Sequence, residues 1–236
     1  MAPGFGAFGK MPGLGDFFRV NLPQGFVETW DLWLQQSILD LRNGMGARWH
    51  DCYMSAPIWR FSLQAGLAGP QAMIGVLMAS VDRVGRQYPL TLAMPLPESQ
   101  SPILDHLIGE AVFRVLEGIA LGALDDAMTR EALATQLQAE QARAGTRAAR
   151  IATCNGTLVA IGAGAQGMLP ELTAALLDPK FRAPSVWSAD VEGGLRLMVC
   201  EGLPGPSQMP GLFDLDAAVW QGATGQGANG QGAAMI

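Results

Sequence analysis

Apolar side chains recur at three- and four-residue spacing after Pro23, and polar side chains occupy the intervening positions. The apolar set consists of Phe26, Trp30, Trp33, Leu34, Ile38 and Leu41. This spacing predicts an amphipathic helix of about five turns that ends at Asn43 and Gly44. Two tryptophans at helical spacing are typical of core packing, so we interpret the stripe as a buried face and not as a ligand platform.

A different periodicity follows the predicted helix. Residues 58–63 alternate between apolar and polar side chains, whereas residues 72–79 are apolar on both faces. Alternation resumes over residues 90–94, before Pro95 and Pro97, which we expect to end the strand. The connections are short, so these three strands are predicted to form an antiparallel meander with a central strand covered on both sides.

The second half of the chain is predicted to be mixed. We expect a nearly all-apolar buried helix, a more exposed helix, one strand entered through the tight turn at Asn155 and Gly156, a short helix starting near Pro170, a β-hairpin and a final helical turn. The corresponding ranges are 103–124, 129–144, 151–163, 169–177, 185–200 and 213–220. Residues 1–220 are predicted to form a single domain, and the Gly-, Gln- and Ala-rich residues 221–236 a flexible tail.

The amino-acid composition excludes some classes of function and favours others. Hydrophobic residues make up 49% of the 236 residues and charged residues only 15%, so we expect a partner to cover part of the apolar surface. A net charge of −6 argues against nucleic-acid binding. Three widely spaced cysteines fit a reduced compartment, and no apolar run reaches about 18 residues. We therefore expect a cytoplasmic protein without membrane insertion.

Residues 79–92 crowd charge into the connection between two apolar strands. Asp82 and Arg86 are four residues apart, Arg83 lies between them, and Gly85 permits a turn with positive φ. Such a loop is either a structural ion-pair lock or a contact surface for a partner. Because buried arginine usually pairs with a carboxylate, we predict that Asp82 pairs with an arginine, with Arg83 the one left free to face a partner.

The N-terminal residues 4–18 form a second glycine-rich region. Residues 4–9 contain a literal GxGxxG, but no strand precedes it and no helix follows directly, so a nucleotide site is not predicted. The following loop carries Lys10, Gly15 and Asp16 in an order that does not match a phosphate-binding P-loop. Asp16 could cap the next turn, or it could pair with Lys10 or with a distant arginine.

Recognisable catalytic motifs are missing from the sequence. It contains neither GxSxG nor HExxH, and its two histidines, His50 and His106, have no partners at metal-ligand spacing. Cys52, Cys154 and Cys200 are interpreted as small buried hydrophobic residues. We predict no metal, no cofactor and no catalytic residue.

Several segments in a fixed order resemble one family. They are residues 9–17 (GKMPGLGDF), 22–26 (LPQGF), 30–36 (WDLWLQQ), 56–61 (APIWRF), 75–90 (GVLMASVDRVGRQYPL) and 199–203 (VCEGL). In this order they resemble the TagF family of type VI secretion-associated proteins. The resemblance is dense over about the first 97 residues.

The resemblance implies an α/β (α+β) domain whose sheet is packed by helices on both sides. It also implies a non-enzymatic, cytoplasmic repressor of type VI secretion that acts after translation by binding a forkhead-associated scaffold protein, Fha. Some relatives carry a fused phosphatase domain, and none is expected here. Two alternatives remain open. One is a small-molecule or phosphate-binding enzyme using Lys10, Asp16, Arg83 and Arg86, and the other is a structural subunit of the secretion machine.

Overall fold

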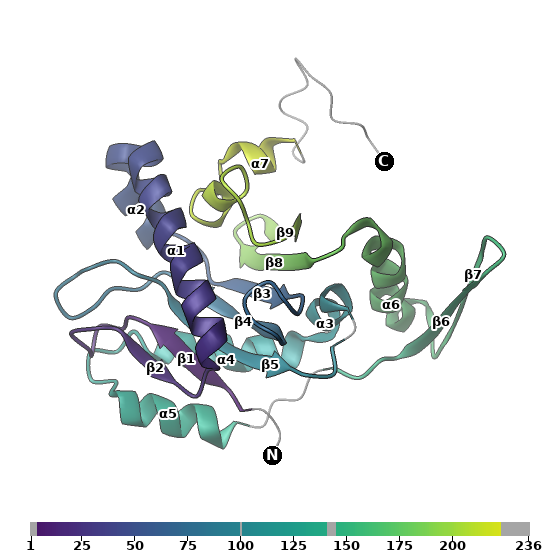
Figure 1. The fold of residues 1–236 in the computed structure, drawn as a ribbon, viewed down its shortest axis with the longest axis horizontal. Helices are drawn as coiled ribbons and strands as arrows, with labels where there is room; N and C mark the ends of the chain where they lie inside the picture. The colour runs from purple at the N-terminus through teal and green to yellow at the C-terminus, as the bar shows by residue number, and fades with distance from the viewer. Residues whose placement is uncertain (1–3, 100, 141–144, 223–236) are drawn as a thin grey trace.

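A computed structural model describes residues 4–99, 101–140 and 145–222. Within these residues seven strands form one antiparallel sheet, in the order β2-β1-β5-β4-β3-β8-β9 (Figure 1). Their bounds are β1 (Gly6–Gly9), β2 (Phe18–Val20), β3 (Trp59–Leu63), β4 (Ala72–Met78), β5 (Leu90–Leu96), β8 (Pro184–Val191) and β9 (Gly194–Glu201). The sheet has helices on both faces, which confirms the predicted fold class (Figure 1).

The predicted meander forms the middle of the sheet. Strand β4 pairs antiparallel with β3 and with β5, and every residue of β4 and β5 is buried. Pro95 does not end β5 as expected, because the strand continues to Leu96 and stops directly before Pro97, the second proline expected to end it. Strand β1 begins at Gly6, which lies opposite Ala93, so β1 does not pair with Pro95. A proline, which lacks an amide hydrogen, is tolerated where no neighbouring strand needs that donor.

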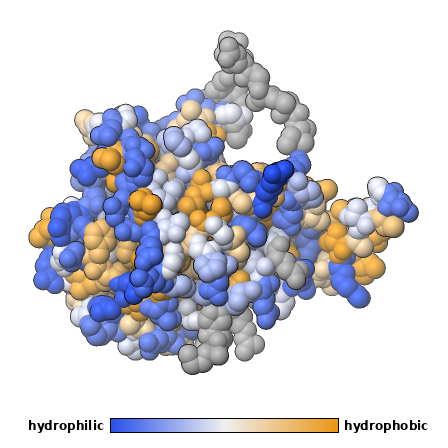
Figure 2. All heavy atoms as spheres, in the orientation of Figure 1, coloured by the Kyte–Doolittle hydropathy of each residue, from blue (hydrophilic) through white to orange (hydrophobic). Residues whose placement is uncertain are grey.

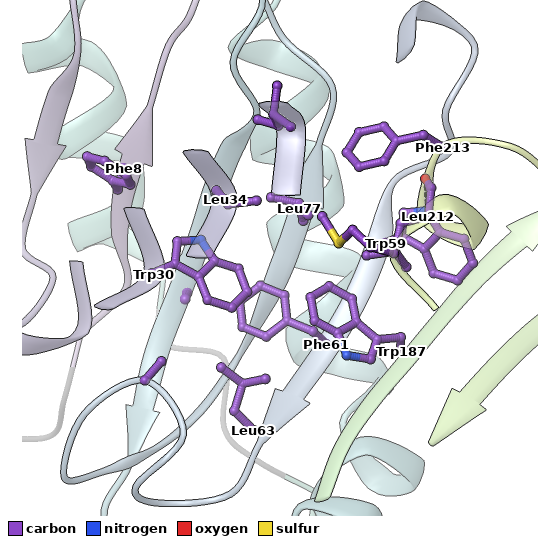
Figure 3. Packing of buried hydrophobic residues seen from close by; sticks show 14 of the residues in the cluster. Phe8, Trp30, Leu34, Trp59, Phe61, Leu63, Leu77, Trp187, Leu212 and Phe213 are labelled. Atoms are coloured by element: carbon purple, nitrogen blue, oxygen red, sulfur yellow. Dashed lines mark hydrogen bonds between the residues drawn. The ribbon is translucent and has the colours of Figure 1, made fainter. Parts of the chain in front are cut away.

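Helix α1 (Gln24–Met45) covers one face of the sheet, as its apolar stripe predicts. Trp30 is fully buried, and its ring centroid lies 4.9 Å from that of Phe61 and 6.1 Å from that of Trp187 (Figure 3). Its indole Nε1 donates to Thr91 Oγ1 at 2.9 Å, which satisfies the polar atom of this buried ring. After η1 (Gly46–Arg48), α2 (Trp49–Met54) extends the same core.

The opposite face is covered by α4 (Glu110–Gly122), whose Val112 and Leu116 join the core of β4 and β5. The prediction of one helix over residues 103–124 was wrong, because Gly109 separates α3 (Pro102–Ile108) from α4. A Cβ on Gly109 would lie 2.8 Å from the Cδ1 of Ile74. The chain therefore uses glycine where its backbone bends close to the sheet. Helix α5 (Arg130–Ala139) follows, and residues 141–144 of its predicted range lie outside the described residues.

A hairpin of β6 (Ala149–Cys154) and β7 (Thr157–Gly162) makes a separate two-stranded sheet. The predicted strand entered through the turn is present as β7, but the strand before the turn, β6, was not predicted. The predicted turn is present, with Asn155 and Gly156 at φ values of 51° and 75°, as in a two-residue hairpin turn. The hairpin and α6 (Ala165–Leu177) stand at one end of the molecule, where apolar surface is exposed (Figures 1 and 2). Ile161 of β7 is 64% exposed.

The remaining predictions for the C-terminal half differ in detail from the structure. Helix α6 starts five residues before Pro170, and η2 (Asp178–Lys180) follows it. The β8–β9 hairpin is confirmed, after which the chain forms η3 (Met209–Leu212) and α7 (Ala218–Gln221). Cys200 is buried, but Cys154 is exposed on the β6–β7 hairpin, contrary to the interpretation of all three cysteines as buried. The single domain over 1–220 stays a prediction, and residues 223–236 lie outside the described residues.

Candidate functional site

Two loops at one end of the sheet meet to form the candidate site. One joins β1 to β2 over residues 10–17, and the other joins β4 to β5 over residues 79–89. Strands β1 and β5 are hydrogen-bonded neighbours, with Phe8 opposite Thr91, so the residues that follow β1 and precede β5 emerge side by side. We refer to these two segments as the paired loops. Every candidate site residue predicted from the sequence lies on one of them.

The carboxylate of Asp82 lies at the centre of the paired loops, and its side chain is 0% exposed. Its Oδ2 accepts hydrogen bonds from Lys10 Nζ at 2.9 Å and from Arg86 Nε at 2.6 Å. Its Oδ1 accepts from the backbone amides of Val84 at 3.1 Å and Arg86 at 2.9 Å. We call Lys10, Asp82 and Arg86 the Asp82 cluster.

These contacts determine the charge state of Asp82. Burial alone would raise the pKa of the carboxyl, but the hydrogen bonds from Lys10 and from the backbone and side chain of Arg86 outweigh it. The pKa of Asp82 is therefore held well below its usual range, and the group is ionised at neutral pH. The predicted pairing of Asp82 with an arginine is present, and Arg86 is that arginine.

Both arginines also reach across to the first loop. Arg86 Nη2 donates to Gly15 O and Arg83 Nη2 to Gly13 O, each at 2.6 Å. The backbone amide of Arg83 donates to Leu14 O at 2.9 Å. Arg83 is thus not left free, contrary to the prediction, because its guanidinium binds a carbonyl of the neighbouring loop. Gly85, at φ 80°, makes the turn that allows its amide to donate to Asp82 O at 2.8 Å.

Asp16 has a local role among the alternatives that the sequence left open. Its Oδ1 accepts from the amide of Phe17 at 2.8 Å, while Lys10 pairs with Asp82 instead. The ring of Phe17 packs 4.7 Å from that of Tyr88 and 4.9 Å from Lys10 Nζ, yet Phe17 remains 45% exposed. Val84, at the tip of the second loop, is 71% exposed. The outer surface of the paired loops is thus apolar at two points.

Aromatic residues that the sequence did not single out hold the second loop against α1 and α2. Tyr53 Oη donates to Ser80 O at 2.7 Å and accepts from Ser80 N at 3.0 Å. Tyr88 Oη donates to Asp31 Oδ1 at 2.6 Å. Burial raises the pKa of both hydroxyls well above the usual range, and the bond to Asp31 adds to the shift for Tyr88. In the sequence, apolar residues near these tyrosines are the only sign that they are buried, and no motif identifies their hydrogen-bond partners.

The geometry does not provide the anion site that the phosphate-binding alternative requires. Lys10 and Arg86 are paired with Asp82, and the guanidinium of Arg83 donates to a carbonyl. These cations therefore satisfy acceptors of the chain itself and do not converge on an open pocket. In the described part of the chain, no three His, Cys, Asp or Glu side chains are grouped so that they could hold a metal ion.

His106 forms a second polar cluster, inside the protein. Its Nδ1 lies 3.2 Å from Ser62 Oγ and its Nε2 lies 2.7 Å from Ser188 Oγ, and all three residues are buried. Burial, and then the positive charge of Arg60, lower the pKa of His106 to about 3. The imidazole is therefore neutral at pH 7 and joins α3 to strands β3 and β8. This role is structural, since solvent does not reach the ring.

Comparisons with known proteins agree with this architecture. Residues 6–140, which include both paired loops, match the family described as TagF N-terminal domain, Type VI secretion system-associated. The crystal structure of PA0076 from Pseudomonas aeruginosa PAO1 is similar, with a TM-score of 0.73 and 30% sequence identity over 90% of this chain and 94% of that chain. No curated protein matches the chain.

The fold and the family match place the chain among the type VI secretion system-associated proteins. Within this class, it belongs to the TagF family. None of the helices in the described ranges combines the length and the apolar character needed to cross a membrane.

Proposed function

We propose that the chain is a non-enzymatic, cytoplasmic regulator that represses type VI secretion by binding a component of the secretion machinery. Membership of a secretion-associated family supports the general role. The resemblance to TagF proteins suggests repression after translation, and it suggests the forkhead-associated scaffold Fha as the partner. The proposed contact surface is the outer side of the paired loops.

The observation that carries this proposal is that the charged groups of Lys10, Asp82, Arg83 and Arg86 all bind partners within the chain itself. Asp82 receives four hydrogen bonds, and the cationic groups of Lys10, Arg83 and Arg86 all donate to the chain itself. Charges bound in this way make the loops rigid. A surface that is already ordered loses less conformational entropy on association, which favours binding.

Two side chains give this rigid surface its apolar contacts. Phe17 projects from the first loop and Val84 from the second, both substantially exposed. An exposed aromatic residue on a fixed backbone is a typical anchor for a protein partner. The charged groups of the Asp82 cluster bind one another and are not left open to a substrate, so binding is the function that the arrangement supports best.

Secretion assays in the native host test the regulatory part of the proposal. Overproduction of the chain is expected to lower secretion of a type VI substrate, and deletion of its gene to raise it. Val84→Asp, which changes an exposed side chain, is expected to remove the effect of overproduction. Unchanged secretion after both overproduction and deletion would contradict repression. Retention of the chain in the assembled, membrane-attached machine would instead favour a structural subunit.

A further inference from the structure

A long groove separates α1 from the C-terminal segment that contains η3 and α7. It encloses about 940 Å³ and borders the buried stripe of α1, since Leu41 of that stripe also lines the groove. Its lining residues on α1 run from Thr29 to Met45. At 1.5 Å per helical residue this corresponds to about 24 Å, the length of a four-turn helix. The indole of Trp33 fixes the two walls together, because its Nε1 donates to Pro204 O at 3.1 Å.

The groove combines an apolar interior with acidic edges. Trp33, Leu41 and Met209 line the interior, and Leu32 stands at its edge with 71% of its surface exposed. Asp40 from α1 and Asp214 from the C-terminal segment lie on opposite walls. Among the described residues, no lysine or arginine lines the groove, although Arg48 pairs with Asp214 from outside it. An occupant should therefore offer apolar side chains in the middle and positive charge at the edge formed by Asp40.

We propose that this groove binds an amphipathic helix of about four turns from a protein partner, with leucine-like residues along one face and lysine or arginine beside them. Helices dock into apolar grooves through side chains at three- and four-residue spacing, and α1 offers complementary positions over the same length. Basic residues flanking the apolar face would lie next to Asp40.

The groove is connected to the paired loops through aromatic contacts. Phe213 follows η3 and packs 5.4 Å from Trp49 and 5.7 Å from Tyr53, measured between ring centroids. Trp49 Nε1 donates to Gln87 Oε1 at 2.7 Å, and Tyr53 Oη to Ser80 O, both on the second loop. These contacts within the core thus link the C-terminal wall of the groove to the second loop. The inference rests on the proposed binding function and adds a second contact surface to it.

The test uses the full chain and a labelled synthetic peptide of about 16 residues. The peptide carries leucines on one helical face and flanking lysines, and its binding is followed by fluorescence anisotropy. A peptide with the same composition but scattered leucines, and one with glutamates in place of the lysines, are controls. We expect the first peptide to bind at least tenfold more tightly than either control.

Two leucines on α1 provide a matched pair of variants. Leu32→Asp is expected to weaken peptide binding at least tenfold, whereas Leu39→Asp should leave it unchanged, since Leu39 is 54% exposed but does not line the groove. Asp40→Lys should weaken binding of the lysine peptide and strengthen binding of the glutamate peptide. Equal effects of Leu32→Asp and Leu39→Asp, or equal binding of all three peptides, would overturn the proposal.

Other occupants give different results. Self-association that Leu32→Asp abolishes would show that a second copy fills the groove. Displacement of the probe by a peptide with the sequence of residues 223–236 would show that the chain fills it itself. Either result overturns the proposal of a partner helix. If Leu32→Asp leaves peptide binding intact while Val84→Asp removes secretion control, the groove proposal fails and the proposed function stands.

Discussion

At the residue scale, the carboxylate of Asp82 determines how the candidate site is built. It forms ion pairs with Lys10, 72 residues earlier in the chain, and with Arg86, four residues later. The first contact joins two loops that are distant in sequence, and the second closes a local turn. Removing the carboxylate would leave the ammonium group of Lys10 buried without its partner.

We therefore expect Asp82→Ala to lower the free energy of unfolding by about 3–5 kcal/mol, as is typical when one member of a buried ion pair is removed. Urea denaturation followed by tryptophan fluorescence would measure this. Asp16→Ala is the matched control, because that carboxylate is exposed and accepts a hydrogen bond from the neighbouring amide of Phe17. A loss below about 1 kcal/mol for Asp82→Ala, equal to that of the control, would show that the cluster does not stabilise the fold.

The same carboxylate gives a pH dependence of known sign. The pKa of Asp82 is lower in the folded protein than the value of about 3.9 expected in the unfolded chain. Its contribution is therefore fully present above about pH 4 and is lost as pH falls toward the folded pKa. The stability difference between the wild-type chain and Asp82→Ala should shrink below pH 4. A difference that grows on acidification would contradict this assignment.

We expect His106 to make the stability depend on pH in a separate range, above that of Asp82. The unfolded imidazole takes up a proton near pH 6.5, whereas the folded protein excludes it until about pH 3. The free energy of unfolding should consequently fall as pH decreases between these two values, with a slope approaching about 1.4 kcal/mol per pH unit. Denaturation at several pH values, with His106→Gln as the comparison, measures this slope.

The difference between the wild-type chain and His106→Gln isolates the imidazole. Asp105 and Asp178 also have shifted pKa values, raised by burial, and their contribution to pH dependence has the opposite sign. Both residues are present in the two proteins, so their effect cancels. Parallel stability curves from pH 6.5 to 4 would show that the imidazole is not buried in its neutral form.

At the element scale, the centre of the sheet depends on close packing between β3, β4 and β5. Gly75 of β4 lies opposite Phe61, and a Cβ at Gly75 would come within 2.7 Å of the Phe61 ring and 2.4 Å of Leu92 O. The glycine thus leaves space for the ring that packs beside Trp30 and Trp187. A side chain there would displace the aromatic core.

Gly75→Ala is expected to destabilise the protein by about 1–3 kcal/mol through overpacking. Gly118→Ala is the control, because Gly118 lies inside α4 with no heavy atom within 4 Å of the added Cβ. That substitution should stabilise the protein by about 0.5–1 kcal/mol, since alanine favours the helix. Thermal unfolding of both variants would test the pair, and a stabilised Gly75→Ala would contradict the packing described here.

Elements with strong periodicity could be predicted, and elements shaped by tertiary contacts could not. The stripe from Phe26 to Leu41 predicts α1 because burial alone determines its spacing. The break at Gly109 was missed, since the apolar pattern continues through it and only the contact with Ile74 requires a bend. In the site, the four-residue spacing indicated the Asp82–Arg86 pair. Lys10 was not predicted as its second cation, because the pairing of β1 with β5 brings it there.

At the scale of the whole molecule, the sheet brings the paired loops together and leaves their outer surface exposed. Helices cover both faces of the sheet, so the exposed loops at its end are available for contact (Figure 1). Family membership indicates a role in type VI secretion. We propose that the chain acts by binding a secretion component through the paired loops.

Quantitative affinity purification from native cytosol tests this claim most directly. The tagged chain and its Val84→Asp variant are compared after thermal unfolding has shown equal stability. The account predicts that the wild-type chain recovers a secretion-system component, the forkhead-associated scaffold being the expected one, and that Val84→Asp recovers at least tenfold less. Recovery of no secretion component by the wild-type chain, or equal recovery by both proteins, would contradict it.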